Sequence, residues 1–284
     1  MSKFTIHPQA KIGAVTLRVA DLKMMADFYE EVLGLHRRRQ ADDGQVVLGA
    51  GATAADILTL REHPTGRHIN GTTGLYHLAI LTPNRASLGD WLKHLVRQNY
   101  ALDGAADHGV SEAIYLHDPE GNGIEVYCDR PRDQWPLVND HLQMTVDPLD
   151  LNAILQEANG VTWTGLPSGT TLGHIHLKVN DTQAAAEFYV DLLGFDLMQS
   201  YPGAKFISAG GYHHHLGVNT WQSRGASPPP AEALGLHSFT IQLPNEAERV
   251  RLVEHVRAAN YPLADSPAGP LLRDPAGLAL TLVV

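Results

Sequence analysis

The sequence has a single cysteine, no run of basic residues and no long apolar segment. The lone thiol, Cys128, cannot form an intrachain disulfide, which favours a reducing compartment. A formal charge of −10 without a Lys/Arg run argues against the concentrated positive field that nucleic acid requires. Residues 1–20 lack the pattern of a signal peptide, and no apolar run approaches the roughly 20 residues that span a bilayer. We therefore expect a soluble, cytoplasmic protein with no nucleic-acid or membrane partner.

The chain is rich in histidine. With 284 residues and 44% hydrophobic composition, the chain can bury a sizeable core, in one large or two ordinary domains. It also carries 16 histidines, enough to ask whether some of them bind one metal ion. Composition alone does not answer this, so the positions of the histidines must be considered.

The chain contains internal repeats. Residues 14–35 (AVTLRVADLKMMADFYEEVLGL) recur as residues 174–195 (HIHLKVNDTQAAAEFYVDLLGF). Residues 77–127 are likewise related to residues 238–283, through a Pro-Asn, an Asn-Tyr and an Asp-Pro pair in the same order. Similarity of this kind indicates a duplicated supersecondary unit. The chain therefore consists of four related units in two halves.

Each unit begins with a strand, continues with a helix and returns in further strands. Val15, Leu17 and Val19 alternate with small or polar residues, which predicts a half-buried strand. Asp21 can cap the helix that follows, and Gly34 can end it. Further strands are predicted from short apolar runs at residues 46–48, 57–60, 114–116 and 124–127.

The repeats also divide the chain. The first half covers residues 1–130 and the second covers residues 170–284, each with two units. Residues 131–169 between them are rich in Pro and Asp, and we expect an ordered linker with one short helix at residues 149–158.

Three motifs connect the sequence to a known family. They are the pattern LxVxDxxxxxxFYxxxLG, which occurs twice, residues 118–125 (DPEGNGIE) and residues 206–221 (FISAGGYHHHLGVNTW). With them the chain resembles the vicinal oxygen chelate superfamily of glyoxalases, bleomycin resistance proteins and extradiol dioxygenases, most of all its two-half catechol 2,3-dioxygenase-like members. The resemblance covers nearly the whole chain. It implies an α+β fold of four βαβββ modules that form two open, cup-shaped barrels.

The resemblance also implies where a metal would bind. In the family, residues on the first strands of two units and a carboxylate on a last strand hold the metal. Those positions fall here on Ala14, His77 and His174, and on Glu125 and Thr281. Only His77, Glu125 and His174 make a 2-His-1-carboxylate set, whose open positions suit a catecholate and dioxygen on Fe(II), or Mn(II) in its place.

This ligand set has a structural consequence, because it requires the second and third units to share one barrel. The first and fourth units would then form a metal-free barrel. His237 is the competing ligand and would make the third and fourth units the active pair, without a carboxylate. Alternation counts against it, because His237 is in phase with Phe239 and Ile241. Whether His237 replaces His77 stays open at this stage.

Further residues match the acid-base groups of the family. The YHHH segment at residues 212–215 is expected on the last strand of the third unit, and the match implies His214 as the acid-base residue. Alternation would send the two flanking histidines to the opposite face. Tyr115 matches the family's active-site tyrosine and would hydrogen-bond a substrate oxygen, with His108 as a supporting candidate. A solvated histidine cluster and a core tyrosine are the structural alternatives.

The function implied by the resemblance is extradiol cleavage of a catechol-type aromatic diol by O2. A glyoxalase-like lyase or isomerase is the alternative enzyme, but it usually has a second carboxylate ligand, and Ala14 and Thr281 supply none. A non-catalytic binding or resistance protein would lack a tightly bound metal. The sequence does not identify the diol, and it leaves the assembly open, a homo-oligomer included.

Overall fold

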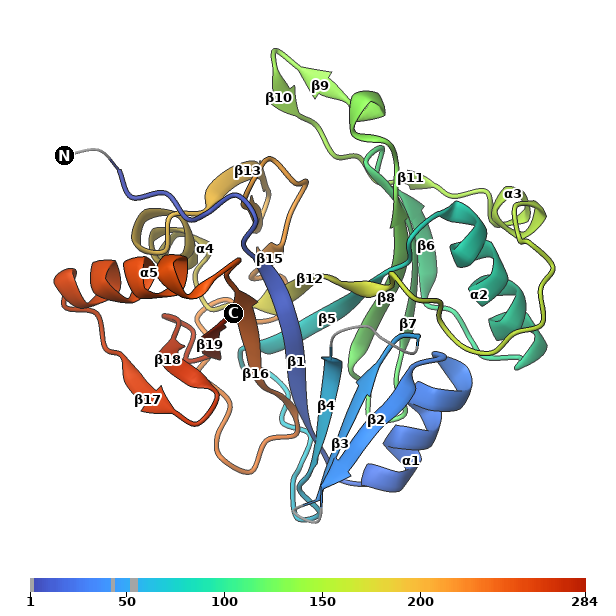
Figure 1. Cartoon of the computed structure of the whole chain (residues 1–284), viewed down its shortest axis with the longest axis horizontal. Coiled ribbons are helices and arrows are strands. Elements are labelled where there is room, and N and C mark those ends of the chain that lie inside the picture. The colour runs from blue at the N-terminus through green and yellow to red at the C-terminus, as the bar shows by residue number, and fades with distance from the viewer. Residues whose placement is uncertain (1–2, 42–43, 52–55) are drawn as a thin grey trace.

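The protein folds around two large, curved sheets, each flanked by helices (Figure 1). The computed structural model describes residues 3–41, 44–51 and 56–284. This mixed α+β architecture of strand-rich units, open on the concave side of each sheet, is the vicinal oxygen chelate fold expected from the repeats. The four short apolar runs lie in strands, as the sequence predicted.

The first sheet joins the first unit to the fourth. In spatial order its strands are β17 (Ala264–Ser266), β18 (Gly269–Arg273), β19 (Ala279–Val283), β16 (Gly235–Gln242), β1 (Lys11–Val19), β4 (Asp56–Glu62), β3 (Gln45–Gly49) and β2 (His36–Ala41). Strands β1 and β16 run antiparallel at its centre, with Thr16 opposite Ser238. The two ends of the chain thus meet in one sheet.

The second sheet joins the second unit to the third. In spatial order it contains β11 (Asp147–Pro148), β6 (Gly104–Asp107), β7 (Ser111–His117), β8 (Gly123–Asp129), β5 (Gly74–Leu81), β12 (Thr171–Lys178), β15 (Leu216–Asn219), β14 (Ala204–Ser208) and β13 (Asp196–Tyr201). Its central antiparallel pair, β5 and β12, places His77 opposite His176. The predicted pairing of units is confirmed.

The helices follow the repeats. They are α1 (Leu22–Asp27) with a π-helical continuation to Val32, α2 (Arg85–Arg97), α3 (Leu151–Gln156), α4 (Thr182–Ala186) with a π-helical continuation to Leu192, and α5 (Glu246–Ala258). Asp21 caps α1 by accepting from the Met24 amide, as predicted. Gly34 follows the helix with φ +87°, a backbone conformation that glycine adopts without steric cost.

A repeated tyrosine connects the two units of each half. Tyr29, after α1, donates a 2.8 Å hydrogen bond to Asp118 in the turn before β8. In the other half Tyr189 donates to Asp274 at 2.9 Å. Glu120 of the same turn as Asp118 accepts from the Ala20 and Asp21 amides at the end of β1. The repeated Phe-Tyr and Asp-Pro motifs therefore hold one sheet against the other.

The linker between the halves is ordered. It contains a short hairpin of β9 (Leu137–Val138) and β10 (His141–Leu142), which projects from the body of the molecule (Figure 1). Strand β11 then pairs with β6. Helix α3 lies within the predicted range 149–158, and an aspartate, Asp150, caps it. The division at residues 130 and 170 remains a prediction about the sequence units.

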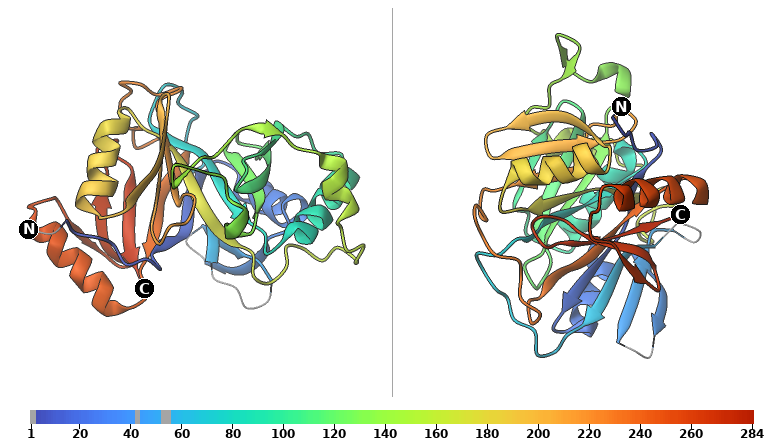
Figure 2. Two further views of the ribbon diagram at one scale, coloured as in Figure 1. Left: turned by 90° about the horizontal axis from the view of Figure 1, so that it is seen from above. Right: turned by 90° about the vertical axis from the view of Figure 1, so that its left-hand side faces the viewer.

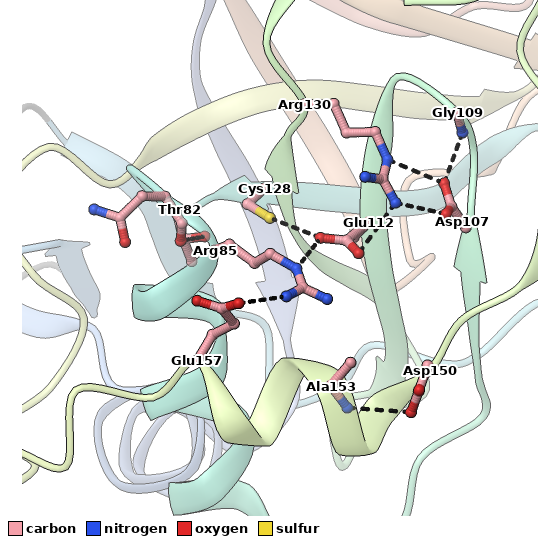
Figure 3. Close-up of polar contacts among 11 residues, drawn as sticks. Thr82, Arg85, Asp107, Gly109, Glu112, Cys128, Arg130, Asp150, Ala153 and Glu157 are labelled. Carbon is pink, nitrogen blue, oxygen red and sulfur yellow. Dashed lines mark hydrogen bonds and ion pairs between the residues drawn. The ribbon is translucent and has the colours of Figure 1, made fainter. Parts of the chain in front are cut away.

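An ion-pair network attaches α3 and α2 to the second sheet (Figure 3). Glu112 of β7 is buried and accepts from Arg85 at 2.7 Å and from Arg130 at 3.2 Å. Arg85 also contacts Glu157, just after α3, at 3.1 Å. Arg130 also pairs with Asp107. These contacts fix β7 and β8 from the side of the sheet opposite to the concave face.

The N-terminal segment packs beside the last helix of the chain (Figure 2). The Phe4 ring stacks on His255 of α5 with a centroid distance of 4.0 Å, and Arg251 donates to the Thr5 carbonyl. This packing continues the contact between the first and fourth units beyond the sheet.

One sequence-based assignment is wrong. Residues 212–215 do not lie on a strand but in the loop between β14 and β15. Alternation therefore does not separate the three histidines, and His213 and His214 are in direct contact, with their Nδ1 atoms 2.8 Å apart. A turn with two glycines, Gly210 and Gly211 at positive φ, ends the strand before the YHHH segment.

Candidate metal centre and substrate pocket

Three side chains that could bind a metal converge on the second sheet. His77 of β5, Glu125 of β8 and His174 of β12 each offer one ligand atom within 4.8 Å of the others. His77 Nε2 lies 3.0 Å and His174 Nε2 lies 3.2 Å from the same oxygen, Glu125 Oε2. All three residues are buried. The sequence predicted this set, and the structure brings its members together.

Strand register explains the convergence. The three strands are neighbours in the order β8, β5, β12. Ala79 of β5 lies opposite Glu125 on one side and His174 on the other, and His77 is two residues from Ala79. Residues opposite one another, or two apart on a strand, share a face of the sheet. The small Ala79 side chain leaves space between the three larger ones.

Burial and mutual contacts set the charge of this group. Burial opposes ionisation of Glu125, but the neighbouring His174 and His77 outweigh burial and lower the pKa of its carboxyl well below the usual range. Burial lowers the pKa of His174 to about 4. At neutral pH the cluster is therefore one carboxylate with neutral imidazole at His174, the protonation states in which these groups bind metals.

The donor set fits a divalent metal ion. Two imidazole nitrogens and one carboxylate oxygen on one face of a sheet leave several coordination positions open. His77 Nε2 is buried and lies near Glu125 without a well-directed hydrogen bond to any described residue. A buried polar atom without a partner is unfavourable unless something else satisfies it. These three residues could therefore hold a metal ion.

A cavity of about 480 Å³ opens beside the cluster. His77 and Glu125 form part of its wall, together with Tyr76, His108, Tyr115, His176, His214 and Trp221. Leu75, Val110, Ile124 and Phe206 add apolar surface. A mostly apolar cavity with a few convergent polar groups is the usual form of a small-molecule site.

Tyr115 and His108 form a hydrogen-bonded pair at this cavity. His108 Nδ1 lies 2.7 Å from the Thr145 carbonyl, which can only accept, so Nδ1 carries the proton. The opposite nitrogen, Nε2, lies 2.7 Å from the Tyr115 hydroxyl and accepts from it. Burial and the Glu125 charge raise the pKa of Tyr115 well above its usual value. The Tyr115 oxygen can therefore accept a further hydrogen bond from a ligand.

His214 is the first member of a second chain of hydrogen bonds. Its ring lies 4.1 Å from the His174 ring, centroid to centroid. His213, fully buried, connects it to Asp129, with His213 Nε2 2.9 Å from Asp129 Oδ1. Tyr212 also donates to Asp129 at 3.1 Å. The sequence predicted His214 and missed Asp129.

The chain Asp129–His213–His214 fixes the position of the protons. The Asp129 carboxylate can only accept, so a His213 ring with one proton carries it on Nε2 and presents a lone pair at Nδ1. His214 must then donate from its own Nδ1, because the two Nδ1 atoms face each other at 2.8 Å. This leaves His214 Nε2 with a free lone pair.

The alternative ligand His237 lies elsewhere. It belongs to β16 in the first sheet, and its Nε2 is 3.4 Å from Arg61 Nη1. The pairing of β1 with β16 is irregular where His237 sits, between the Thr16–Ser238 and Leu17–Leu236 pairs. Simple alternation does not describe such a position. His77 is the residue that lies beside Glu125.

Several pocket residues were not assigned roles from the sequence. His176 and Lys178 of β12 line the cavity, on the face of the strand where alternation from His174 places them. Tyr76 and Trp221 pack against the His176 ring. The sequence does not predict that Tyr76 and Trp221 face the cavity, because their position depends on how three strands curve together. Met144 and Thr145 of the linker also reach the cavity, and only the pairing of β11 with β6 brings them there.

Comparison with known proteins identifies the family. The family model of the Glyoxalase/Bleomycin resistance protein/Dioxygenase superfamily matches residues 11–126 and 171–280. The chain belongs to this superfamily. A Bacillus subtilis (strain 168) protein named catechol-2,3-dioxygenase is 39% identical over 286 residues, which cover 99% of both chains.

Two solved structures share the fold. A Bacillus subtilis subsp. subtilis str. 168 protein, provisionally described as a dioxygenase, superposes with a TM-score of 0.65 and 16% identity, covering 99% of this chain and 86% of that one. Glyoxalase I from Zea mays superposes with a TM-score of 0.59 and 15% identity, covering 97% and 92%. In the part of the chain that the structure describes, no helix has the length and apolar character needed to span a membrane.

Proposed function

We propose that this protein is an Fe(II)-dependent extradiol dioxygenase, which opens the ring of a catechol-type diol with O2 beside the two hydroxyl groups. The observation that carries the proposal is the convergence of His77, Glu125 and His174 beside a largely apolar cavity, whose wall includes His77 and Glu125. The 39% identity to a protein named catechol-2,3-dioxygenase supports the same chemistry. The resemblance of the motifs to extradiol enzymes agrees with it.

His77, Glu125 and His174 would hold the metal. When bound there, Fe(II) would supply adjacent positions for both diol oxygens and for O2, and a route for electrons between them. The same nitrogen and oxygen donors suit Mn(II), which we propose as a substitute. The remaining residues of the pocket bind and orient the diol and move its protons.

His214 is proposed to accept a proton from the diol. Its Nε2 has the free lone pair, and the residue lines the cavity. A proton taken up at Nε2 places positive charge on His214, next to His213, whose Nδ1 lone pair accepts from it. Asp129 stabilises that charge from the far side of His213. The same proton can be returned at Nε2 when the ring-cleaved product forms.

Tyr115 is proposed to orient the second hydroxyl group of the diol. Its own proton is directed to His108, so its oxygen accepts a hydrogen bond from the substrate. The Thr145 carbonyl holds His108 in the tautomer that this arrangement needs. A linker residue thereby supports the orientation of a side chain on β7.

The apolar part of the pocket is proposed to hold the aromatic ring. Leu75, Val110 and Phe206 line it, and Trp221 and Tyr76 offer ring faces and edges. Aromatic rings pack favourably in such surroundings, and the apolar wall keeps water away from the reacting atoms. The proposed partners are thus one small aromatic diol and O2. We propose a cytoplasmic location.

A glyoxalase-like reaction is the alternative enzyme function. It would use a second carboxylate at the metal, and among the described residues the only carboxylate in the cluster is Glu125. Thr281, at the repeat-equivalent position, lies in the other sheet. This single carboxylate favours oxygen chemistry over isomerisation. A non-catalytic binding protein would retain the cavity but no tightly bound metal.

The test combines metal analysis with an oxygen assay. Protein purified without air and reconstituted with Fe(II) should bind about one iron per chain. With a panel of catechols it should consume O2 and form a yellow ring-fission product in equal amounts. The His174→Ala variant should lose both metal and turnover, while the exposed-site variant Arg97→Gln should keep both. Iron-loaded protein that consumes no O2 with any diol, or full occupancy in His174→Ala, would contradict the proposal.

A further inference from the structure

Four basic side chains gather on the first sheet, the one without the metal-binding cluster. Arg18 of β1 and Arg61 of β4 are direct partners in the register of these two parallel strands. The Nε2 atom of His237, on β16, lies 3.4 Å from the Nη1 atom of Arg61. Arg273, at the end of β18, completes the basic cluster, and its charge acts on both Arg18 and His237.

The basic cluster occupies positions that the internal repeat relates to the substrate pocket. Arg18 corresponds to Lys178 in the first repeat, and Arg273 corresponds to His117 through the Asp-Pro motif that follows each. His237 corresponds to Tyr76, one residue before the positions of Ser238 and His77. Lys178, His117 and Tyr76 all line the metal-side cavity.

The metal-binding positions themselves have been replaced in this sheet. The residues equivalent to His174, His77 and Glu125 are Ala14, Ser238 and Thr281. None of these can supply an imidazole or a carboxylate ligand. In the first sheet, the positions equivalent to the pocket rim therefore carry basic residues. The positions equivalent to the three metal ligands carry neither an imidazole nor a carboxylate.

The basic cluster has no acidic partner among the residues the structure describes. Arg18 donates to the Ala231 carbonyl at 3.1 Å and Arg273 to the Gly277 carbonyl at 3.0 Å, and neither forms an ion pair there. Burial, with the charges of the three arginines, lowers the pKa of His237 to about 4. Neutral His237 can accept from Arg61 at Nε2 and still donate from Nδ1.

Three guanidinium groups repel one another, so gathering them is unfavourable unless an anion neutralises their charge. The protein has an excess of acidic residues, with a net charge of −10, yet none of those the structure describes pairs with this cluster. Guanidinium groups bind planar carboxylates and phosphates through paired N–H donors. We propose that Arg18, Arg61, Arg273 and His237 form a binding site for a small anion, a compound with a carboxylate or phosphate group, distinct from the metal-side pocket. The site is independent of the reaction assigned to the second sheet.

The test is calorimetric titration of the metal-loaded full-length protein with inorganic phosphate and, separately, with malonate. The two probes distinguish a phosphate ligand from a carboxylate ligand. Wild-type protein should bind at least one of them saturably, and more weakly as ionic strength rises. The double variant Arg61→Gln/Arg273→Gln should weaken that binding by about tenfold or more, because two charge-assisted donors are removed.

A matched control has the same change in net charge. Arg97→Gln/Arg257→Gln alters two exposed arginines in the last turns of α2 and α5 and should bind the probe like the wild type. This control also separates local binding from general charge effects. Binding that is equally strong in the Arg61/Arg273 variant would place the anion elsewhere, on the metal for example. Absence of saturable binding of both probes to the wild type at millimolar concentration would overturn the proposal.

Discussion

The Nδ1 atoms of His213 and His214 face each other at 2.8 Å, so one ring must donate to the other. Because Asp129 accepts from the far nitrogen of His213, the donor is His214. The lone pair at His214 Nε2 is therefore determined by a carboxylate that lies two imidazole rings away. Asp129 is a positioning residue in the proposed reaction.

Replacement of Asp129 by Asn tests this assignment. The amide can donate to His213 Nε2, which favours the opposite tautomer along the chain and removes the lone pair at His214 Nε2. We expect turnover to fall by about 10²-fold, in the range of a lost general base, with little change in KM or iron content. Steady-state oxygen uptake across pH measures this, and the rate of Asp129→Asn should show an altered pH profile. An unchanged kcat and pH profile would remove Asp129 from the mechanism.

Two buried glutamates should respond differently to the same change. Glu125→Gln removes the only carboxylate of the cluster, so iron affinity should fall at least about 100-fold while the fold is retained. Glu112→Gln, on the opposite side of the sheet, leaves Arg85 and Arg130 without their shared partner (Figure 3). It should lower the free energy of unfolding by about 1–3 kcal/mol but keep the iron. Metal analysis and urea denaturation of both variants provide the comparison, and equal iron loss would refute it.

The tyrosines that connect the units should contribute to stability in both halves. Tyr29→Phe leaves the buried Asp118 with one donor fewer, and Tyr189→Phe does the same for Asp274. Each should lower the free energy of unfolding by about 1–3 kcal/mol, because a buried acceptor loses its partner. The effects should add in the double variant, since the two pairs belong to different halves. Chemical denaturation measures all three, and a loss below a few tenths of a kcal/mol would show that the Tyr–Asp contacts are unimportant.

Asp274 should make stability depend on pH. Burial raises the pKa of its carboxyl from 3.8 to about 6. Between these values the folded protein holds a proton that the unfolded chain releases, so this group makes the free energy of unfolding decrease as pH rises. The decrease should amount to about 3 kcal/mol at most. Asp274→Asn should lack it, so the stability of wild type relative to this variant should fall between pH 4 and 6.5. A pH-independent difference would show that Asp274 does not titrate in this window.

Much of the fold and the cluster could be predicted from the sequence. Alternation on short strands gives the side of each residue, and the resemblance to the superfamily implies the ligand positions, so His77, Glu125 and His174 could be named without coordinates. That set in turn required the second and third units to share a sheet, which the structure confirms.

The remaining features depend on geometry that local sequence does not encode. The YHHH segment has no break typical of a loop, apart from the two glycines before it, so its sequence predicts a strand. The irregular register at His237 and the contact of Asp129 with His213 arise from tertiary packing. The three arginines of the basic cluster come from three different strands, and only the observed register brings Arg18 and Arg61 side by side.

The pairing of the units also determines when the protein can fold during synthesis. Strand β1 is synthesised long before its central partner β16, which lies far downstream in the chain. Pairings between such distant segments form slowly, because a long loop must close first. The nascent chain therefore carries β1 with one edge unpaired until β16 has been synthesised, whereas β5, β8 and β12, with the proposed iron ligands, can assemble earlier.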